Sequence, residues 1–416
     1  MRRLENPGLR TFADPEPIVL SRASGSWLED VNGKRFLDLS GLYAVSIIGH
    51  GHPKVVEAVK DQAEKLIHCP SAYPSETRAE FLEMVESIVP KGLDSILPAM
   101  TGAMANEMAV SMAHVRRPRG RIISFSGSYF GRSTGIVGLA GKVNYRDNLG
   151  IDTNAQFMPF PNLLTMGPDA TDQVMNVLKV LAGKAGGLGE IAAVILEPIQ
   201  GNGGVLIPPP DFLPRIRAFC DETGALLITD EIQSGNGRTG TMWAAEQWGV
   251  TPDILTMGKG IGGGMAVAAV ATRKELVNWA ADSYSSTFLT NNVNLAAGIA
   301  AMGVMKSEKL AARAKAVGPK FLNRMKQQLS GLPGVAEVRG IGMWYATELV
   351  DKQGAPDGKS ASRILQQLKR QGIIAGGGGY SGNVVKLAPA LNIDEKDLSD
   401  GVDATIAAIK ASSAAL

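Results

Sequence analysis

The feature that most constrains the fold is a series of short apolar runs in the middle of the chain. Six runs have the length and composition of β-strands, and several are separated by helical segments such as ANEMAVSMAHVRR and DFLPRIRAFCDET. Near-continuous apolar strands between helices are typical of a mostly parallel sheet covered on both faces. The sequence therefore predicts an α/β architecture built on SILPAM, RIISF, IAAVILEP, ALLITD, DILTM and MAVAAVAT.

The segments before and after this series have a different texture. At residues 26–39 two alternating runs flank an Asn-Gly dipeptide, which predicts an antiparallel hairpin with a two-residue turn. Helices are expected next from Pro53 and from Thr77, because proline suits the first helical position and Thr77 and Glu80 have capping-box spacing.

The C-terminal quarter is expected to form a second, smaller unit. A long helix, a strand pair, another helix, a glycine-rich loop, a strand and a final helix are predicted in that order. We expect a large domain over residues 50–309, and a small α+β domain formed by residues 1–49 and 310–416 together.

Composition indicates an ordinary globular protein and excludes several classes of function. Hydrophobic residues make up 45% of the chain, and 42 basic against 40 acidic residues leave a net charge of +2. No basic run is long enough to follow nucleic acid, and no apolar stretch is long enough to span a membrane. Cys69 and Cys220 lack disulfide-framework or metal-site spacing, and the N-terminus lacks the apolar segment of an export signal. We expect a cytoplasmic protein without a metal site.

Polar residues with distinct chemistry follow four of the predicted strands. In open parallel sheets ligands bind beyond the carboxyl ends of the strands. One strand leads into Gly102 and a helix, whose N-terminus suits an anion such as phosphate, and others end at Tyr129, Asp230 and Lys259. A nucleotide-binding P-loop is excluded at Lys259, because Ser or Thr does not follow it and the first glycine of that motif is absent.

The combination of groups matches one cofactor. A lysine with a lowered pKa forms Schiff bases, an aspartate can keep a pyridine nitrogen protonated, and a helix N-terminus can hold a phosphate. These are the requirements of pyridoxal phosphate.

The stretch LLITDEIQSGNGRTG, followed by PDILTMGKGIGGG, resembles the class III (ω-amino acid type) pyridoxal-phosphate-dependent aminotransferases of fold type I. The resemblance runs from about residue 17 to the end of the chain. It implies a large domain with a mostly parallel, seven-stranded type of sheet, a small α+β domain from both termini, and a homodimer or dimer of dimers.

The resemblance also implies roles for residues around the cofactor ring. Lys259 would form the Schiff base and then move the proton. Asp230 would pair with the pyridine nitrogen, and Gln233 would approach the phenolic oxygen. Ile232 and Tyr129 would pack on opposite faces of the ring.

Further roles follow from the same resemblance. Gly102 and Ala103 would donate N–H groups to the phosphate, and Thr287 would reach the phosphate of the neighbouring subunit. Glu197 would lie beside the cofactor residues, although an ion pair with Arg238 is an equal alternative. Simpler interpretations stay open elsewhere: Tyr129 as a core aromatic, Asp230 as a cap, and Thr287 as a turn residue.

Several positions depart from the family pattern and bear on the substrate. Lys386 stands where many relatives have an arginine for the substrate carboxylate, and Asn202 stands where some have the glutamate that switches that arginine. A lysine attracts a carboxylate but lacks the bidentate fork of arginine. Lys386 is therefore predicted to contact the substrate carboxylate, with a solvent-facing strand lysine as the alternative and Arg132 as the next candidate.

The predicted function is transfer of an amino group from a primary amine or ω-amino acid to pyruvate or 2-oxoglutarate. Tyr43 lies where ω-transaminases often carry an aromatic that shapes the donor pocket. A racemase or epimerase and a decarboxylase of the same family stay open as alternatives, although groups specific to decarboxylation are missing. An anion-binding protein without covalent chemistry is the alternative from another class.

Overall fold

A computed structural model describes residues 4, 6, 8, 14, 16–147, 149–151 and 155–414. The N-terminal stretch used above to argue against an export signal lies mostly outside these residues. The largest element is a seven-stranded sheet, as predicted. Its strands, in spatial order, are β4 (Ser95–Ala99), β10 (Ala268–Thr272), β9 (Ile254–Met257), β8 (Leu226–Asp230), β7 (Ile191–Leu196), β5 (Arg121–Phe125) and β6 (Ala155–Met158).

Five neighbouring strands of this sheet, from β9 to β6, are parallel. β10 is antiparallel to both of its neighbours, so that β4 again runs in the common direction. The carboxyl ends of β4, β5, β7, β8 and β9 consequently meet at one edge of the sheet. All six strands predicted from the apolar runs are present, and β6 is the one that the sequence did not predict.

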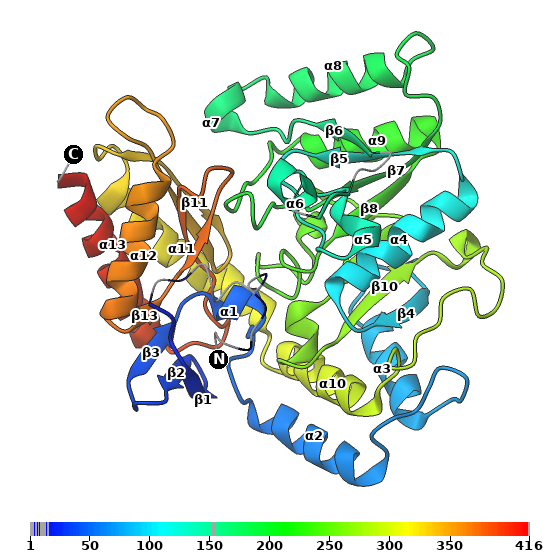
Figure 1. Cartoon of the computed structure of the whole chain (residues 1–416), viewed down its shortest axis with the longest axis horizontal. Coiled ribbons are helices and arrows are strands. Elements are labelled where there is room, and N and C mark those ends of the chain that lie inside the picture. The colour runs from blue at the N-terminus through cyan, green and yellow to red at the C-terminus, as the bar shows by residue number, and fades with distance from the viewer. Residues whose placement is uncertain are drawn as a thin grey trace.

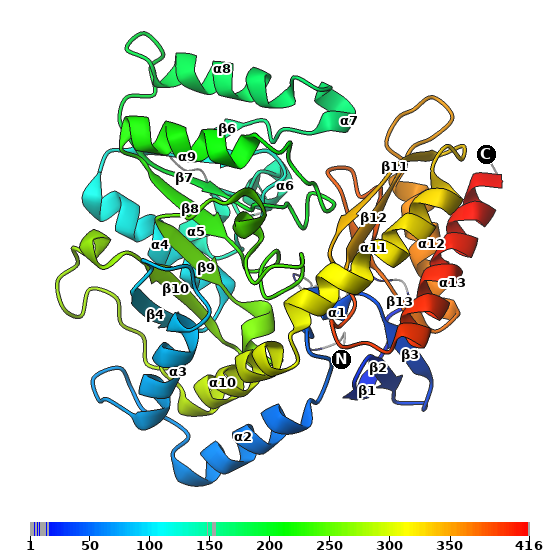
Figure 2. The same ribbon diagram turned by 180° about the vertical axis from the view of Figure 1, so that it is seen from behind.

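Helices cover both faces of the sheet (Figures 1 and 2). α4 packs on one face, where its alanine and methionine side chains contact apolar residues of the strands. α8 and α9 cover part of the other face, and α10 with α2 and α3 cover the remainder. These helices and the short turns among them are α2 (Pro53–Lys65), α3 (Glu76–Glu86), α4 (Gly102–Arg116), α5 (Thr134–Val137), α6 (Val143–Asp147), α7 (Leu163–Met166), α8 (Ala170–Ala182), α9 (Phe212–Thr223), η2 (Ala244–Trp248), η3 (Lys259–Gly262), η4 (Lys274–Leu276) and α10 (Asn292–Ser307).

The C-terminal part forms a smaller antiparallel sheet in the order β11-β12-β15-β14. α11, α12 and α13 lie beside this sheet, on the side of the molecule away from α8 and α9 (Figure 2). The elements are α11 (Leu310–Leu329), β11 (Val335–Ile341), β12 (Trp344–Leu349), α12 (Gly358–Arg370), β13 (Ile373–Ile374), β14 (Gly376–Gly378), β15 (Val384–Leu387) and α13 (Glu395–Ala414).

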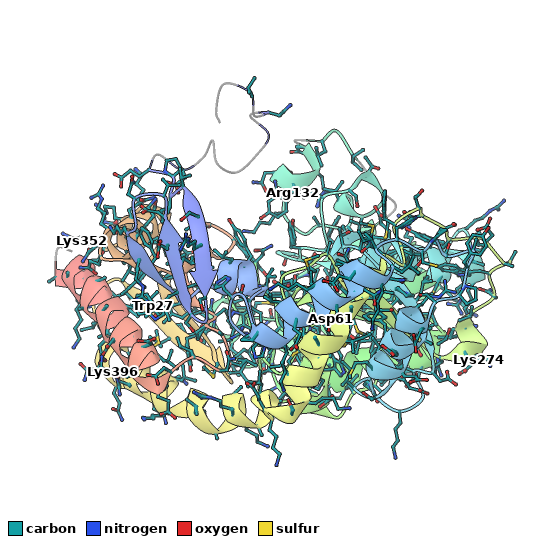
Figure 3. All side chains as sticks on the ribbon, turned by 90° about the horizontal axis from the view of Figure 1, so that it is seen from below. Trp27, Asp61, Arg132, Lys274, Lys352 and Lys396 are labelled. Atoms are coloured by element: carbon teal, nitrogen blue, oxygen red, sulfur yellow. The ribbon has the colours of Figure 1, made fainter. Side chains whose placement is uncertain are left out.

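The N-terminal hairpin joins this C-terminal part. Strands β1 (Leu20–Ser24), β2 (Trp27–Asp30) and β3 (Arg35–Asp38) form a sheet with β13, which pairs in parallel with β3. Trp27, labelled in Figure 3, donates its indole N–H to Asp397 of α13 at 2.8 Å. The N-terminal hairpin is therefore packed against β13 and α13, and the exact boundaries at residues 50 and 309 stay a prediction.

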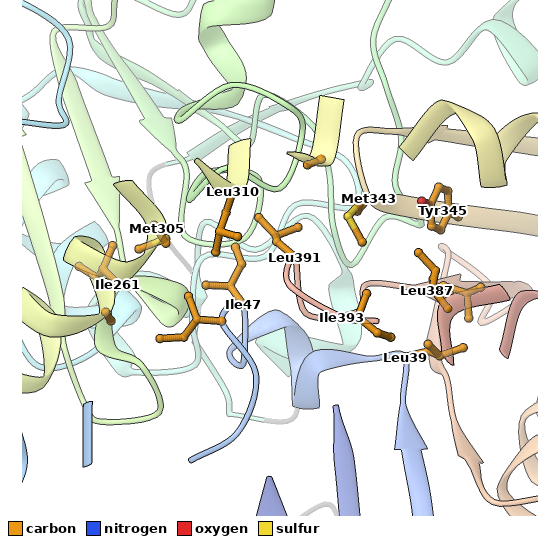
Figure 4. Packing of buried hydrophobic residues seen from close by; sticks show 14 of the residues in the cluster. Leu39, Ile47, Ile261, Met305, Leu310, Met343, Tyr345, Leu387, Leu391 and Ile393 are labelled. Carbon is orange, nitrogen blue, oxygen red and sulfur yellow. The ribbon is translucent and has the colours of Figure 1, made fainter. Parts of the chain in front are cut away.

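The core is continuous between the two parts of the molecule. One cluster of buried apolar side chains runs from Ile261, beside the large sheet, through Leu310 and Leu391 to Leu387 of β15 (Figure 4). Since protein interiors are close-packed, this continuity fixes the C-terminal part relative to the edge where the strand ends meet.

Two local predictions are wrong. The hairpin turn has three residues, because Gly33 N–H bonds to Asp30 O and Asp30 N–H bonds to Lys34 O, with Gly33 left-handed at φ 81°. α3 begins one residue earlier than Thr77 and is capped by Ser75, whose hydroxyl accepts from Arg78 N–H. The hydroxyl of Thr77 instead donates to Gln62.

In the part of the chain that the structure describes, no helix combines the length and apolarity needed to cross a bilayer. The same residues contain no cluster of three or more His, Cys, Asp or Glu side chains suited to a metal ion.

Gly318 of α11 allows the helix to pack against the turn between β11 and β12. A Cβ atom at this position would lie 1.9 Å from Gly342 O, whereas one on Gly303 of α10 would meet no atom within 4 Å. We expect G318A to lower the free energy of unfolding by about 1–3 kcal/mol, because the added methyl group would force the backbone of the turn at Gly342 to move. The control G303A should be neutral or stabilising by up to about 1 kcal/mol, since alanine favours helix. Urea denaturation of both variants tests this, and similar effects of the two substitutions would contradict it.

Candidate active site

The predicted Asp230 and Lys259 are brought together by two neighbouring parallel strands. β8 ends at Asp230, which is in register with Thr256 of β9, and Lys259 follows two residues after β9 ends. Asp230 and Lys259 are close enough for the charge of each to shift the pKa of the other. The structure therefore places these two predicted residues at the same edge of the sheet.

Lys259 occupies an unusual backbone conformation at the start of η3. Its φ is 48°, in the left-handed region that side chains other than glycine rarely adopt. Burial lowers the pKa of its amine, while Asp230 and Glu197 oppose that shift. A lysine with a lowered pKa has more of the unprotonated form, which is the nucleophile.

The carboxylate of Asp230 is 4% exposed and is held by two donors. One oxygen accepts from Ile232 N–H at 2.9 Å, and the other accepts from Asn106 Nδ2 at 2.8 Å. Burial raises the pKa of Asp230 to about 6, whereas both hydrogen bonds and Lys259 lower it. A carboxylate offers about four lone-pair positions, so two donors leave room for another.

Glu197 follows β7 and holds two loops. Its oxygens accept from Tyr129 N–H at 3.0 Å and from Gly201 N–H at 2.9 Å. Burial, with the nearby charge of Asp230, raises the pKa of Glu197 to about 8 against the effect of these donors. Glu197 thus ties the loop after β5 to the loop after β7.

The alternative ion pair between Glu197 and Arg238 is wrong. Arg238 is fully buried, and its guanidinium donates to the backbone carbonyls of Met343 and Pro389 at 3.0 and 2.6 Å. Arg238 therefore fastens the C-terminal part to the large sheet instead of neutralising Glu197.

The N-terminus of α4 lies at the same edge. The hydroxyl of Thr101 caps it by accepting from Met104 N–H. Within the described residues, the N–H groups of Gly102 and Ala103 have no hydrogen-bond acceptor. A Cβ atom on Gly102 would lie 2.7 Å from Ile232 Cδ1, so a larger residue cannot replace this glycine without displacing Ile232. This helix end can receive an anion.

Tyr129 is partly exposed beside this helix end. Its ring makes an edge contact with the ring of Tyr145, with 5.5 Å between the centroids. The guanidinium of Arg132 lies over the Tyr145 ring, 4.6 Å from its centroid. Tyr129 is thus held at its backbone by Glu197 and at its ring by Tyr145, which contradicts a purely core position.

Lys386 lies on β15 and is 7% exposed, which contradicts the alternative of a solvent-facing lysine. Its ammonium group donates to Gly201 O at 2.9 Å, and its aliphatic chain lies against Gly378. Gln233 reaches the same loop, because a Cβ atom on Gly201 would lie 2.1 Å from Gln233 Oε1. Lys386 and Gln233 are therefore both adjacent to the loop that Glu197 holds.

Two predicted residues lie on the surface. Tyr43 is 63% exposed and belongs to α1 (Gly41–Ala44), a turn in which all four residues have φ between 41° and 68°. Thr287 is exposed, and it forms no hydrogen bond within the part of the chain that is described. A single chain does not bring Thr287 to the residues above.

Sequence reasoning missed two residues of this region. Asn106, in the helical segment ANEMAVSMAHVRR, bonds directly to Asp230. The hydroxyl of Tyr380, in the glycine-rich loop, lies within hydrogen-bond distance of two acceptors, Ser126 O at 3.0 Å and Gln200 Oε1 at 3.1 Å. The sequence did place Asn106 one helical turn after Gly102, on the same face of the helix, and this spacing could have indicated that it lies near the site.

Comparisons with known proteins agree on one family. The family described as Aminotransferase class-III matches residues 11–409. The acetylornithine aminotransferase of Methanosarcina mazei is 35% identical over 392 residues, which are 93% of this chain and 91% of that protein. The 4-aminobutyrate aminotransferase of Escherichia coli is 34% identical over 409 residues, 97% and 96% of the two chains.

A solved structure gives the same result. The taurine:2-oxoglutarate aminotransferase of Bifidobacterium kashiwanohense, in complex with pyridoxal phosphate and glutamate, superposes with a TM-score of 0.87 and 26% identity. The similarity covers 95% of this chain and 92% of that chain.

Glu231, next to Asp230, allows a test of the electrostatics of this edge. It is fully buried, accepts from the Ser234 hydroxyl and from Ala245 N–H, and has a pKa raised by burial to about 7. Because the folded pKa lies above the unfolded one, folding is favoured at low pH, and this stabilisation is lost as pH rises from about 4.5 to 7.

In E231Q an amide can keep both hydrogen bonds without titrating. The wild-type protein without cofactor should lose about 2–3 kcal/mol of unfolding free energy more than E231Q between pH 5 and 8. Urea denaturation across this range provides the measurement. Parallel stability curves for the two proteins would show that the buried carboxyl does not bind a proton in this way.

Proposed function

Because this chain belongs to the class III aminotransferase family and is a pyridoxal-phosphate-dependent aminotransferase, we propose that it transfers an amino group from a primary amine or ω-amino acid to pyruvate or 2-oxoglutarate. The observation that carries the assignment of its reactive residue is the juxtaposition of Lys259 and Asp230 at adjacent strand ends. The relatives are aminotransferases, so the racemase, decarboxylase and non-enzymatic alternatives are not supported.

The residues at the sheet edge fit each part of the cofactor. Asp230 has lone pairs left for a ring nitrogen, and the N–H groups of Gly102 and Ala103 suit the phosphate. Ile232 lies against Gly102 and Gly258, where its side chain can contact a flat ring. We propose Tyr129 for the opposite face and Gln233 for the phenolic oxygen.

Pyridoxal phosphate, when bound, supplies a carbonyl carbon that takes up amino groups and a conjugated ring that delocalises negative charge. Lys259 would act first as a nucleophile and then as a base, and burial favours both roles because a lowered pKa increases the unprotonated fraction of the amine. Asp230 would pair with the ring nitrogen and favour its protonated form. Glu197 keeps the Tyr129 and Gly201 loops in place through its two backbone hydrogen bonds.

A second copy of the chain completes the site in this proposal. Thr287 is exposed next to Phe288, an aromatic residue that is 53% exposed. In this proposal the surface around these two residues is covered by the partner subunit, so that Thr287 contacts the phosphate held there. We also propose a cytoplasmic location for this homodimer.

The experiment that tests the function is cofactor trapping on the full chain. Borohydride reduction after incubation with pyridoxal phosphate should add the reduced cofactor's mass to the peptide containing Lys259, and K259A should not be labelled there. A single turnover with 4-aminobutyrate or a primary amine should release pyridoxamine phosphate on denaturation. A label on another lysine would refute the assignment, and racemisation without pyridoxamine phosphate would refute aminotransfer.

We further propose that Lys386 is the main electrostatic contact of the acceptor carboxylate. It stands at the family's arginine position, is buried, and lies against the loop that Glu197 holds. A carboxylate that leaves water for a buried site requires a charged partner.

K386M should therefore raise the KM for pyruvate or 2-oxoglutarate by roughly tenfold or more, as expected for loss of a charge-assisted hydrogen bond. The half-reaction with an uncharged amine donor should change little. Steady-state and single-turnover kinetics measure the two effects separately. R132M is the comparison variant, and a raised KM in R132M with normal kinetics in K386M would move the contact to Arg132.

A further inference from the structure

Asn106 connects three segments of the site through one buried amide. It lies on α4 and is fully buried. Its Nδ2 donates to Asp230 Oδ2 at 2.8 Å and to Phe130 O at 2.9 Å, and its Oδ1 accepts from the Thr256 hydroxyl at 2.7 Å. Phe130 adjoins Tyr129, and Thr256 is on the strand that leads to Lys259.

The orientation of this amide is determined by its partners. Both Asp230 and Phe130 present oxygen atoms, so only the NH₂ side can face them. Thr256 gives its hydroxyl proton to the remaining oxygen and thereby opposes rotation of the amide. A buried network in which every member is paired specifies a single arrangement.

The bond from Asn106 stabilises the ionised form of Asp230, because a donor to a carboxylate favours the charged state. The Ile232 N–H and the charge of Lys259, at the end of β9, also favour the charged form of this carboxylate, whereas burial opposes it. Glu197, at the end of β7, and the neighbouring Glu231 also face Asp230, and the charge of Asp230 raises the pKa of both. Removal of the Asn106 bond would therefore make Asp230 easier to protonate.

We propose that Asn106, oriented by Thr256, is a positioning residue that keeps Asp230 ionised and aimed at the ring nitrogen of the cofactor. This inference rests on the proposed function of Asp230. It assigns to α4 a second task beyond its N-terminal N–H groups, and it links the Asp230 carboxylate to the segments that carry Tyr129 and Lys259.

The chain offers a matched pair of threonines for the test. Thr256 and Thr229 are both fully buried in adjacent strands of the large sheet. Thr256 donates to Asn106, whereas Thr229 Oγ1 has no hydrogen-bond partner among the described residues. T256V and T229V make the same chemical change, so only T256V should disturb the amide. N106L removes the amide itself while filling a similar volume.

The measurement is the dissociation constant of pyridoxal phosphate as a function of pH, for the wild-type protein, T256V, T229V, N106L and the double variant N106L/T256V. When Asp230 is protonated it no longer holds the ring nitrogen's charge, so affinity falls at low pH. The pH at which half of the affinity is lost should rise by about one unit in N106L and by less in T256V. T229V should match the wild-type protein.

The T256V substitution should weaken binding several-fold near pH 6.5 in the wild-type background and have no further effect in N106L, because Thr256 acts through the amide. If N106L does not fold, the comparison of pyridoxal phosphate affinity between T256V and T229V still tests the role of Asn106. Equal weakening at every pH, equal effects of T256V and T229V, or unchanged binding in all variants would overturn the role of Asn106. Failure of the wild-type protein to bind pyridoxal phosphate would overturn the proposed function as well.

Discussion

The interaction between the Asp230 carboxylate and the Lys259 amine is the one on which the rest of the site depends. Both groups lose hydration at the edge of an apolar sheet, which raises the pKa of one and lowers the pKa of the other, and each charge partly offsets the cost for its neighbour. Parallel pairing of β8 with β9 sets their separation. The Ile232 N–H and the Asn106 amide hold the carboxylate in one orientation. The hydrogen bonds that orient the Asp230 carboxylate therefore also connect parts of the fold, since one of them joins α4 to β8.

Much of this arrangement could be predicted from the sequence, because a polar residue that directly follows an apolar strand lies at the carboxyl edge of the sheet. Asp230 and Lys259 were recognisable for that reason, and the parallel sheet then brought them to one edge. Asn106 could not be recognised in the same way. Its partners lie 24, 124 and 150 residues away in the sequence, and around it the helix contains alanine and methionine that suit ordinary packing.

Other differences come from tertiary contacts that override local preference. Thr77 has the spacing of a cap, but its hydroxyl bonds to Gln62 of the neighbouring helix and Ser75 takes the capping position. The glycine run near the C-terminus was expected to be a loop, yet Gly376–Gly378 form β14 because β15 offers a free edge. Lys386 is buried because the loop after β7 covers its ammonium group, and that contact joins two distant parts of the chain. Local pattern cannot contain such information.

Backbone strain occurs at the candidate site and in a surface turn. Of the eight described residues other than glycine with positive φ, Lys259 is a candidate site residue, Asn236 lies beside it, and Leu42, Tyr43 and Ala44 form the turn α1. Such conformations cost on the order of 1–3 kcal/mol each and persist only when surrounding contacts fix them. Asn236, for example, donates to Gly258 O directly before Lys259, and Ala388 N–H bonds to Leu39 O beside the left-handed turn. Glycine would relieve the strain at residue 259 but would bring no amine, so a conformation that favours glycine is occupied by the side chain that the proposed reaction requires.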